Sequence, residues 1–263
     1  MAVEIKRYQV DAFAEETFRG NPAVVCPLDK WLPDDLMQRI AMENNLSETA
    51  FYVKEGEGFR IRWFTPTVEV DLCGHATLAS AFVLFNHEHY RGDKIVFQSR
   101  SGPLHVSKSN EWITLNFPAD AMTEVPVSPE LYAGFQEKPS KIWKGKTDYM
   151  LVYDREIQIK NCKPDFIAVK KIKARGIIVT AKGDSVDFVS RFFCPQSGID
   201  EDPVTGSAHT SLVPYWAGVL GKEQLSARQI SAREGKLFCE LQSDRVLMSG
   251  TGKLFSTGVI YLP

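Results

Sequence analysis

Two short segments of the sequence recur, and this internal repeat is the feature that most constrains the fold. Residues 62–67, RWFTPT, recur as residues 191–196, RFFCPQ, at an offset of 129 residues. Residues 74–77, GHAT, recur as residues 206–209, GSAH, at an offset of 132 residues. Each copy reads as a strand, a proline turn, an acidic loop, a glycine and a helix of small residues. The repeat predicts two related halves, joined by a connector between residues 118 and 129.

The helices and strands expected in these halves differ in their apolar patterns. Residues 75–85 are apolar nearly all round, which predicts a buried helix. Residues 207–220 read as its counterpart, and Pro214 should kink or shorten that helix. Residues 31–45 read as an amphipathic helix, whereas short alternating segments such as residues 1–13 read as strands.

We therefore predict an α/β (α+β) fold of two pseudo-symmetric halves. Each half is expected to be a mainly antiparallel, barrel-like sheet wrapped round a central helix. The N-terminal half is predicted over residues 1–119 with the GHAT helix, and the closing strand 255–263 can pack with it. The C-terminal half is predicted over residues 120–263 with the EDPVTGSA helix. Because strands outnumber helices, the pattern argues against a parallel doubly wound sheet.

Composition excludes several classes of partner and location. The 263 residues carry 31 Lys and Arg against 33 Asp and Glu, and a formal net charge of −2 argues against nucleic acid as a partner. We read the basic stretch at residues 160–175 as a solvated face. No stretch approaches the ~18–20 apolar residues of a membrane span, and no signal peptide is expected. Five cysteines without a CxxC pair favour a reducing, cytoplasmic compartment and no zinc ribbon.

The two glycine-initiated helices and the carboxylates near them are the candidate site. Asp71, Leu72 and Cys73 precede Gly74, and the acidic segment 200–205 precedes Gly206. The first amides of a helix have no intrahelical partner and carry partial positive charge, and glycine lets a ligand approach them closely. Two such ends facing each other predict an anion-binding cleft between the halves. Two tight glycine turns with a purely structural role are the alternative.

The side chains around these helix ends allow more than one interpretation. Asp202 fits an acid that complements a helix dipole, as well as a functional carboxylate. His75 fits a structural histidine or a neutral proton relay, because the helix N-terminus should disfavour its charged form. Cys73 fits a nucleophile with a lowered thiol pKa or a small buried residue. From its pattern alone, Glu48 reads as an exposed glutamate at a strand edge.

Five segments, spread from one end of the chain to the other, resemble the PhzF-like family of phenazine-biosynthesis proteins. They are VDAFAEETFRGNPAVV, NNLSETAF, RWFTPTVEVDLCGHATLASA, FFCPQSGIDEDPVTGSAHTSLVPYW and STGVIYL. SETAF, CGHAT and EDPVTGSA in this order are specific together. The resemblance implies the diaminopimelate epimerase-like fold, an active site in the cleft between two halves, a homodimer, and no metal or organic cofactor.

The resemblance also implies roles for individual residues. Glu48 of the SETAF motif corresponds to the general acid/base of the family. The other catalytic positions are His75 of GHAT and Asp202 of EDPVTGSA, and the substrate-binding positions are Cys73, Gly74, Gly206 and Ser207. Epimerases of this fold use two opposed cysteines. Here Cys73 occupies the first thiol position but Thr205 the second, so two-thiol epimerisation is not expected.

The expected function is that of a cofactor-independent isomerase. Glu48 would move a carbon-bound proton on a small carboxylate-bearing metabolite by general acid/base catalysis. Two alternatives stay open at this point. One is a non-catalytic ligand-binding or protein-interaction protein that keeps the cleft. The other is an epimerase-like or racemase-like enzyme that depends on Cys73.

Overall fold

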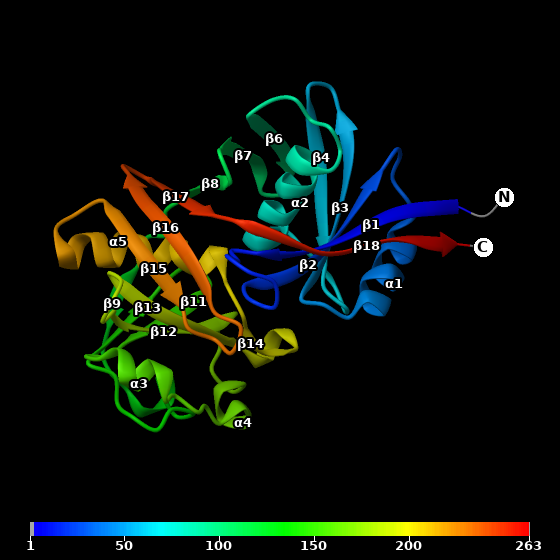
Figure 1. Ribbon diagram of the computed structural model, residues 1–263. Coiled ribbons are helices and arrows are strands. Elements are labelled where there is room, and N and C mark those ends of the chain that lie inside the picture. Colours follow the sequence, from blue (N-terminus) through cyan, green and yellow to red (C-terminus); the bar gives the residue numbers. More distant parts are fainter. Residues whose placement is uncertain (1–2, 263) are drawn as a thin grey trace. The chain divides into compact units, whose positions relative to one another are not determined.

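The computed structural model describes residues 3–262 of the chain (Figure 1). Residues 1–2 and 263, which the predicted first and last strands included, lie outside the described residues. The chain divides into two compact units. Unit 1 consists of Met1–Phe117 and Met248–Pro263, and unit 2 consists of Pro118–Leu247.

Unit 1 is a curved sheet with one surface helix and one central helix. Its strands are β1 (Val3–Ala12), β2 (Asn21–Leu28), β3 (Glu48–Glu55), β4 (Gly58–Phe64), β5 (Glu69–Val70), β6 (Lys94–Ser99), β7 (Gly102–Ser109), β8 (Trp112–Pro118) and β18 (Gly252–Leu262). Its helices are α1 (Asp34–Asn44) and α2 (Gly74–Asn86). Figure 1 shows these strands around α2, which packs against β1, β2 and β3.

Most strand pairs of unit 1 are antiparallel, with two parallel exceptions. Antiparallel pairs join β18 to β1, β1 to β2, β3 to β4, β4 to β5, β6 to β7 and β7 to β8. Parallel pairs join β2 to β3 and β4 to β6. The prediction of a mainly antiparallel sheet is therefore confirmed for this unit.

Unit 2 repeats this plan with its own central helix. Its strands are β9 (Thr123–Val125), β10 (Lys141–Lys144), β11 (Asp148–Val152), β12 (Gly176–Lys182), β13 (Phe188–Cys194), β14 (Ile199–Asp202), β15 (Gln224–Gln229) and β16 (Gly235–Gln242). β17 (Arg245–Gly250) leads the chain out of the unit. The helices are α3 (Glu156–Lys160), α4 (Phe166–Val169) and α5 (Gly206–Leu220), with short 3-10 turns at Pro129–Leu131 and Pro195–Ser197.

Strand pairing shows that the two units share one topology. The series β11, β12, β13, β15 and β16 has the same order of parallel and antiparallel pairs as β2, β3, β4, β6 and β7. The short strands β5 and β14 each flank the equivalent long strand, β4 or β13. The predicted pseudo-symmetry is therefore present in the hydrogen-bonding pattern as well as in the sequence.

Helix α2 is buried, as its all-round apolar sequence predicts. Ten of its residues are buried, including Leu78, Ala79 and Val83. The prediction for α1 also agrees with the structure, since Met37, Ile40 and Ala41 form its buried face. These three side chains pack in one cluster with residues of β2 and β3.

Pro214 does not shorten α5, and that part of the prediction is wrong. The helix continues past Pro214 to Leu220. A proline inside a helix leaves the carbonyl four residues earlier without its N–H partner. Here that carbonyl belongs to Thr210, and the N–H of Asp120 donates to it at 3.0 Å. The connector before β9 thus replaces the missing hydrogen bond.

The C-terminal segment returns to unit 1 earlier than the predicted strand 255–263. Unit 2 ends at Leu247, and β18 pairs with β1 from Gly252 onward. The reason is the length of β1, whose ten residues pair with β18 between Gly252 and Leu262, with one register shift between Gln9 and Val10.

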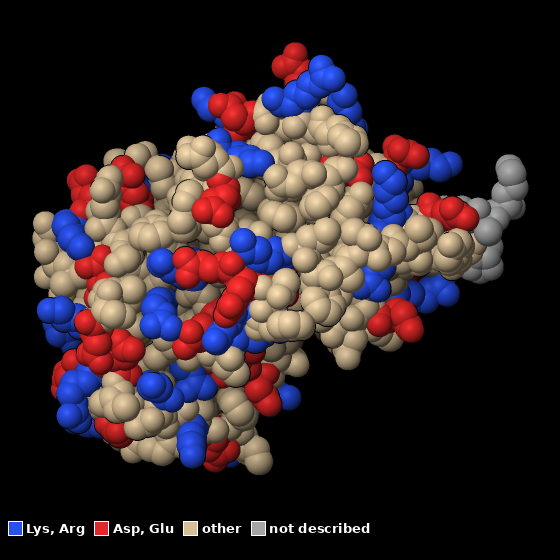
Figure 2. All heavy atoms as spheres, viewed as in Figure 1, with Lys and Arg blue, Asp and Glu red and all other residues tan. Residues whose placement is uncertain are grey.

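Charged side chains of both signs are interspersed on the face shown in Figure 2. This mixture agrees with the formal net charge of −2. Over residues 3–262, no helix combines the length and the apolar character needed to cross a membrane.

Leu78→Ala should lower the free energy of unfolding by about 2–5 kcal/mol, because Leu78 is fully buried in α2 and the change leaves a cavity. Met42→Ala on the exposed side of α1 is the matched control, and we expect a change within about 0.5 kcal/mol. Urea unfolding followed by circular dichroism measures both. Equal effects of the two changes would contradict the central position of α2.

Candidate active site

Four polar side chains of unit 1 meet where α2 begins. His75 is the second residue of α2, Glu48 is the first residue of β3 and Asn21 is the first residue of β2. Cys73 is the residue before α2. Because β2 and β3 pair in parallel, with Ala23 beside Glu48, the first residues of both strands lie at the same end of the sheet.

Local backbone geometry brings these residues into place. Gly20 has φ +66°, and a Cβ there would collide with the carbonyl oxygen of Ala12, so glycine is required before Asn21. Asn45 ends α1 in the left-handed conformation, with its N–H donating to Ala41, and the chain then turns into β3. Cys73 is extended and has no capping hydrogen bond from its side chain.

Glu48 lies against His75 and is not the exposed strand-edge residue that its pattern indicated. Oε2 of Glu48 lies 3.1 Å from Nε2 of His75, and their side chains are 15% and 4% exposed. The pattern failed because a long-range contact with α2 covers the start of β3. A carboxylate with one oxygen held against an imidazole and part of its surface open can exchange a proton with a ligand.

We expected the N-terminus of α2 to disfavour the charged form of His75, and this prediction is wrong. Burial lowers the pKa of His75, but the Cys73 sulfur and the Glu48 carboxylate oppose burial and raise that pKa well above its ordinary value. The partial positive charge of the helix N-terminus has a smaller effect on this pKa than the full negative charge of Glu48 at 3.1 Å.

Cys73 is a buried thiol in this structure. Its Sγ lies 3.6 Å from Nδ1 of His75. Burial, with the nearby Glu48 charge, raises the pKa of Cys73 to about 11 despite its position before a helix. Of the two interpretations of Cys73, the small buried residue therefore fits better than the nucleophile with a lowered pKa.

Glu48, Cys73 and His75 also place their donor atoms within 4.8 Å of one another, a spacing that a metal ion could use. Glu48 faces Nε2 of the ring, whereas Cys73 faces Nδ1. Partners at opposite ring nitrogens do not converge on one tetrahedral centre. The arrangement suits proton exchange through the imidazole better than metal binding.

Unit 2 carries the other predicted site residues at the start of α5. Asp202 ends β14, and the hydroxyl of Thr205 donates to Oδ2 of Asp202 at 2.6 Å. Gln229 donates to Oγ1 of Thr205 at 3.1 Å and accepts from the backbone N–H of Thr205 at 2.8 Å. Thr205 therefore holds Asp202 in place with its only hydroxyl proton.

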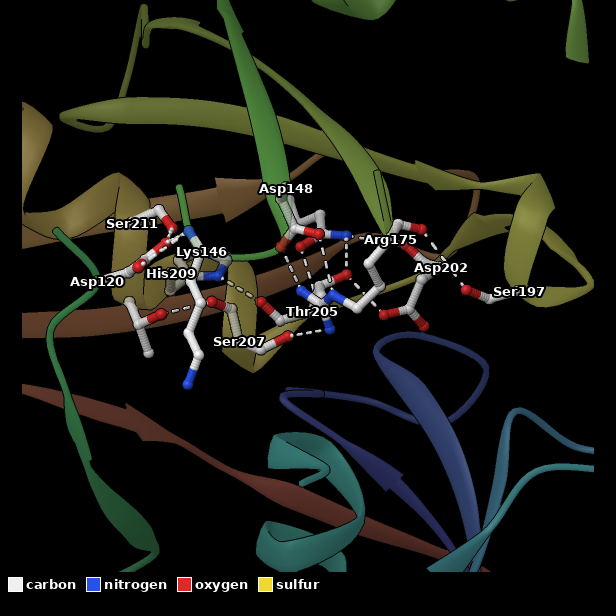
Figure 3. Close-up of polar contacts among 12 residues, drawn as sticks. Asp120, Lys146, Asp148, Arg175, Ser197, Asp202, Thr205, Ser207, His209 and Ser211 are labelled. Carbon is white, nitrogen blue, oxygen red and sulfur yellow. Dashed lines mark hydrogen bonds and ion pairs between the residues drawn. The ribbon is translucent and has the colours of Figure 1, made fainter. Parts of the chain in front are cut away.

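Gly206 and Ser207 begin α5, and beside them lies a residue that sequence reasoning missed. Arg175 donates to Oγ of Ser207 at 2.9 Å and pairs through two nitrogens with the buried carboxylate of Asp148 (Figure 3). Arg175 closes the basic stretch that we read as solvated, so for this residue the reading is wrong. Its position directly before a buried strand was the available signal.

The repeat shows that only unit 1 carries the Glu48–His75 pair. Thr49 pairs with Phe64 in unit 1, and Ile177 pairs with Phe193 in unit 2. Because Phe64 and Phe193 match in the repeat, the residue equivalent to Glu48 is Gly176. By the second repeat segment, His75 corresponds to Ser207. Unit 2 therefore keeps the helix start but has neither side chain of the pair.

Comparison with known proteins shows the family of this chain. The family model described as phenazine biosynthesis-like protein matches residues 10–258. An uncharacterized isomerase of Pseudomonas aeruginosa is 52% identical over 261 residues, which cover 99% of this chain and 100% of that protein. Phenazine biosynthesis-like domain-containing protein 1 of Mus musculus is 40% identical over 286 residues, covering 95% of this chain and 96% of that protein.

Solved structures place the fold in the same group. A PhzF-family protein of Enterococcus faecalis has a TM-score of 0.96 and 51% identity, with 99% of this chain and 100% of that chain covered. A probable proline racemase of Agrobacterium radiobacter has a TM-score of 0.67 at 8% identity, covering 97% and 92%, and this likeness concerns the fold alone. The predicted diaminopimelate epimerase-like fold is confirmed, and the chain belongs to the phenazine biosynthesis-like (PhzF) family.

Proposed function

We propose that this protein is a cofactor-independent isomerase in which Glu48 is the general acid/base. The observation that carries the proposal is the Glu48–His75 contact at 3.1 Å, in which the glutamate side chain stays 15% exposed. Membership of the family and the isomerase names of its bacterial relatives support the reaction class. The proposed substrate is a small metabolite that carries a carboxylate.

The proposed reaction moves one proton within the substrate. Glu48, as a carboxylate, removes a proton from a carbon that lies beside a carbon–carbon double bond and is activated by a carboxylate, and the electron pair delocalises into the double bond. The protonated Glu48 then returns the proton to a second carbon on the same face. The double bond shifts, and the substrate and product have the same composition and charge. Neither an oxidant nor a reductant takes part.

The remaining site residues have supporting roles in this proposal. His75 lies 3.1 Å from Oε2 of Glu48, and we expect this ion pair to direct the other oxygen to the substrate. The amides of Gly74, Gly206 and Ser207 are expected to bind the substrate carboxylate, because first-turn amides favour anions. Asp202, held by Thr205, is expected to orient the substrate. The homodimer and the cytoplasmic location implied by the resemblance stay predictions.

The alternatives are less well supported. A thiol whose pKa is raised to about 11 is a weak base at neutral pH, which counts against a mechanism that depends on Cys73. Thr205 stands at the second thiol position and already donates to Asp202. A purely ligand-binding protein has no need of a carboxylate held against a histidine.

Glu48→Gln should reduce turnover by about 10²–10⁴-fold, because the amide cannot accept the substrate proton. The measurement is a screen of metabolite pools in deuterated water, in which solvent deuterium incorporation is followed by mass spectrometry. Glu55→Gln, at the exposed far end of β3, is the matched control and should leave exchange unchanged. Full exchange in Glu48→Gln would remove Glu48 from the mechanism.

Cys73→Ser should keep deuterium exchange within about tenfold of the unchanged protein, because the thiol is not the proposed base. The same metabolite screen measures it, with Cys26→Ser, buried in β2, as the control for loss of a buried thiol. A loss in Cys73→Ser as large as that in Glu48→Gln would instead favour the Cys73-dependent enzyme.

The Glu48–His75 contact also predicts how stability depends on pH. The pKa of His75 in the folded protein lies above its unfolded value of about 6.5. The contact therefore stabilises the fold fully below about pH 6.5. This stabilisation is lost as the pH rises through the folded pKa. Glu48→Gln removes the carboxylate, so the fall in stability as the pH rises above about 6.5 should become smaller. Urea unfolding across this range tests the sign, and an unchanged pH dependence would contradict it.

A further inference from the structure

The two ring nitrogens of His75 face different partners within unit 1. Nε2 faces Oε2 of Glu48 at 3.1 Å. Nδ1 lies 3.2 Å from Nδ2 of Asn21 and 3.6 Å from Sγ of Cys73. The groups facing the ring therefore come from β3, from β2 and from the residue before α2.

These partners determine where the proton of a neutral ring is stable. An ionised carboxylate only accepts hydrogen bonds, so the neutral ring must carry its proton on Nε2 to interact favourably with Glu48. Nδ1 is then a lone-pair acceptor that needs a donor. The amide nitrogen of Asn21 is a strong donor at the right distance, whereas a thiol is a weak one.

The surroundings fix the backbone of Asn21 at this position. Asn21 is fully buried, and its backbone pairs with Ala12 in the β1–β2 ladder. Gly20, which no larger residue can replace without a collision, sets the direction of the chain just before it. The contact with Nδ1 therefore cannot be exchanged for bulk water without opening the sheet.

An asparagine amide differs from other partners because it carries both a donor and an acceptor. When Nδ1 is bare, the NH₂ group donates to it. When the ring gains a second proton, a half-turn of the amide presents Oδ1 as the acceptor. The same side chain can therefore hold the ring in both protonation states.

We propose that Asn21 is the positioning residue of the site: it places the proton of neutral His75 on Nε2, facing Glu48, and supports the ring when it takes up a second proton. The Nε2–H of neutral His75 then donates to the Glu48 carboxylate and keeps it oriented, and the substrate proton stays on Glu48 because Nε2 has no free lone pair. This inference rests on the proposed function of the Glu48–His75 pair.

The test is ring-¹⁵N NMR of the protein labelled in histidine, with the His75 signals assigned by their loss in His75→Asn. In the unchanged protein, above the pKa of His75, Nε2 should carry the proton and Nδ1 should show the shift of a bare, hydrogen-bonded nitrogen. A neutral ring protonated on Nδ1 would overturn the proposal, and this measurement needs no variant of Asn21.

Two variants separate positioning from simple packing. Asn21→Asp offers only an acceptor, so the proton affinity of His75 should rise about 10- to 1,000-fold. Asn21→Leu offers neither group, so the neutral ring should populate both tautomers. Asn44→Asp is the control, because it adds the same charge to unit 1 at a residue that is hydrogen-bonded to Thr49 instead of His75. In this variant His75 should titrate as in the unchanged protein. An unaltered titration in Asn21→Asp would overturn the proposal.

The experiments separate a wrong role for Asn21 from a wrong proposed function. Deuterium exchange that persists in Glu48→Gln would reject Glu48 as the base, whatever the tautomer of His75. A ring protonated on Nδ1, with exchange still dependent on Glu48, would reject the role of Asn21 alone.

Discussion

The parallel pairing of β2 with β3 is the constraint on which the site depends. Parallel strands begin at the same end of a sheet, so Asn21 and Glu48 lie at one end of the sheet although they are far apart in the sequence. Helix α2 begins at that end, and its second residue reaches both of them. Burial of α2 by the surrounding strands then fixes the imidazole, because apolar side chains anchor the helix along its length.

The two units share one scaffold but differ in the side chains at the candidate site. Both units contain the same arginine–glutamate–phenylalanine interaction. In unit 1, Arg62 pairs with Glu69 and lies over the ring of Phe64. In unit 2, Arg191 pairs with Glu201 and lies over the ring of Phe193. The repeated RWF and RFF segments thus conserve a structural interaction. The site side chains differ, since unit 2 has Gly176 and Ser207 where unit 1 has Glu48 and His75.

Several predictions succeeded because they depend on local patterns. The buried character of α2 and the buried face of α1 follow from apolar spacing alone. The predictions that failed concern partners brought in from elsewhere in the chain. Glu48 looked exposed until α2 covered it, and Pro214 looked disruptive until Asp120 supplied the missing hydrogen bond. Arg175 looked solvated until Asp148 and Ser207 bound it.

By itself, the sequence determined the internal repeat, the central helices and the motif residues of a PhzF-family member, because each of these depends on short local segments and on their order along the chain. The tertiary structure alone decided which side chains meet. The contact of Glu48 with Nε2 of His75 and of Asn21 with Nδ1 requires residues from β2, β3 and α2 to converge. The raised pKa of Cys73 likewise follows from burial and a neighbouring charge. Protonation states depend on distances and solvent exclusion, which residue order does not specify.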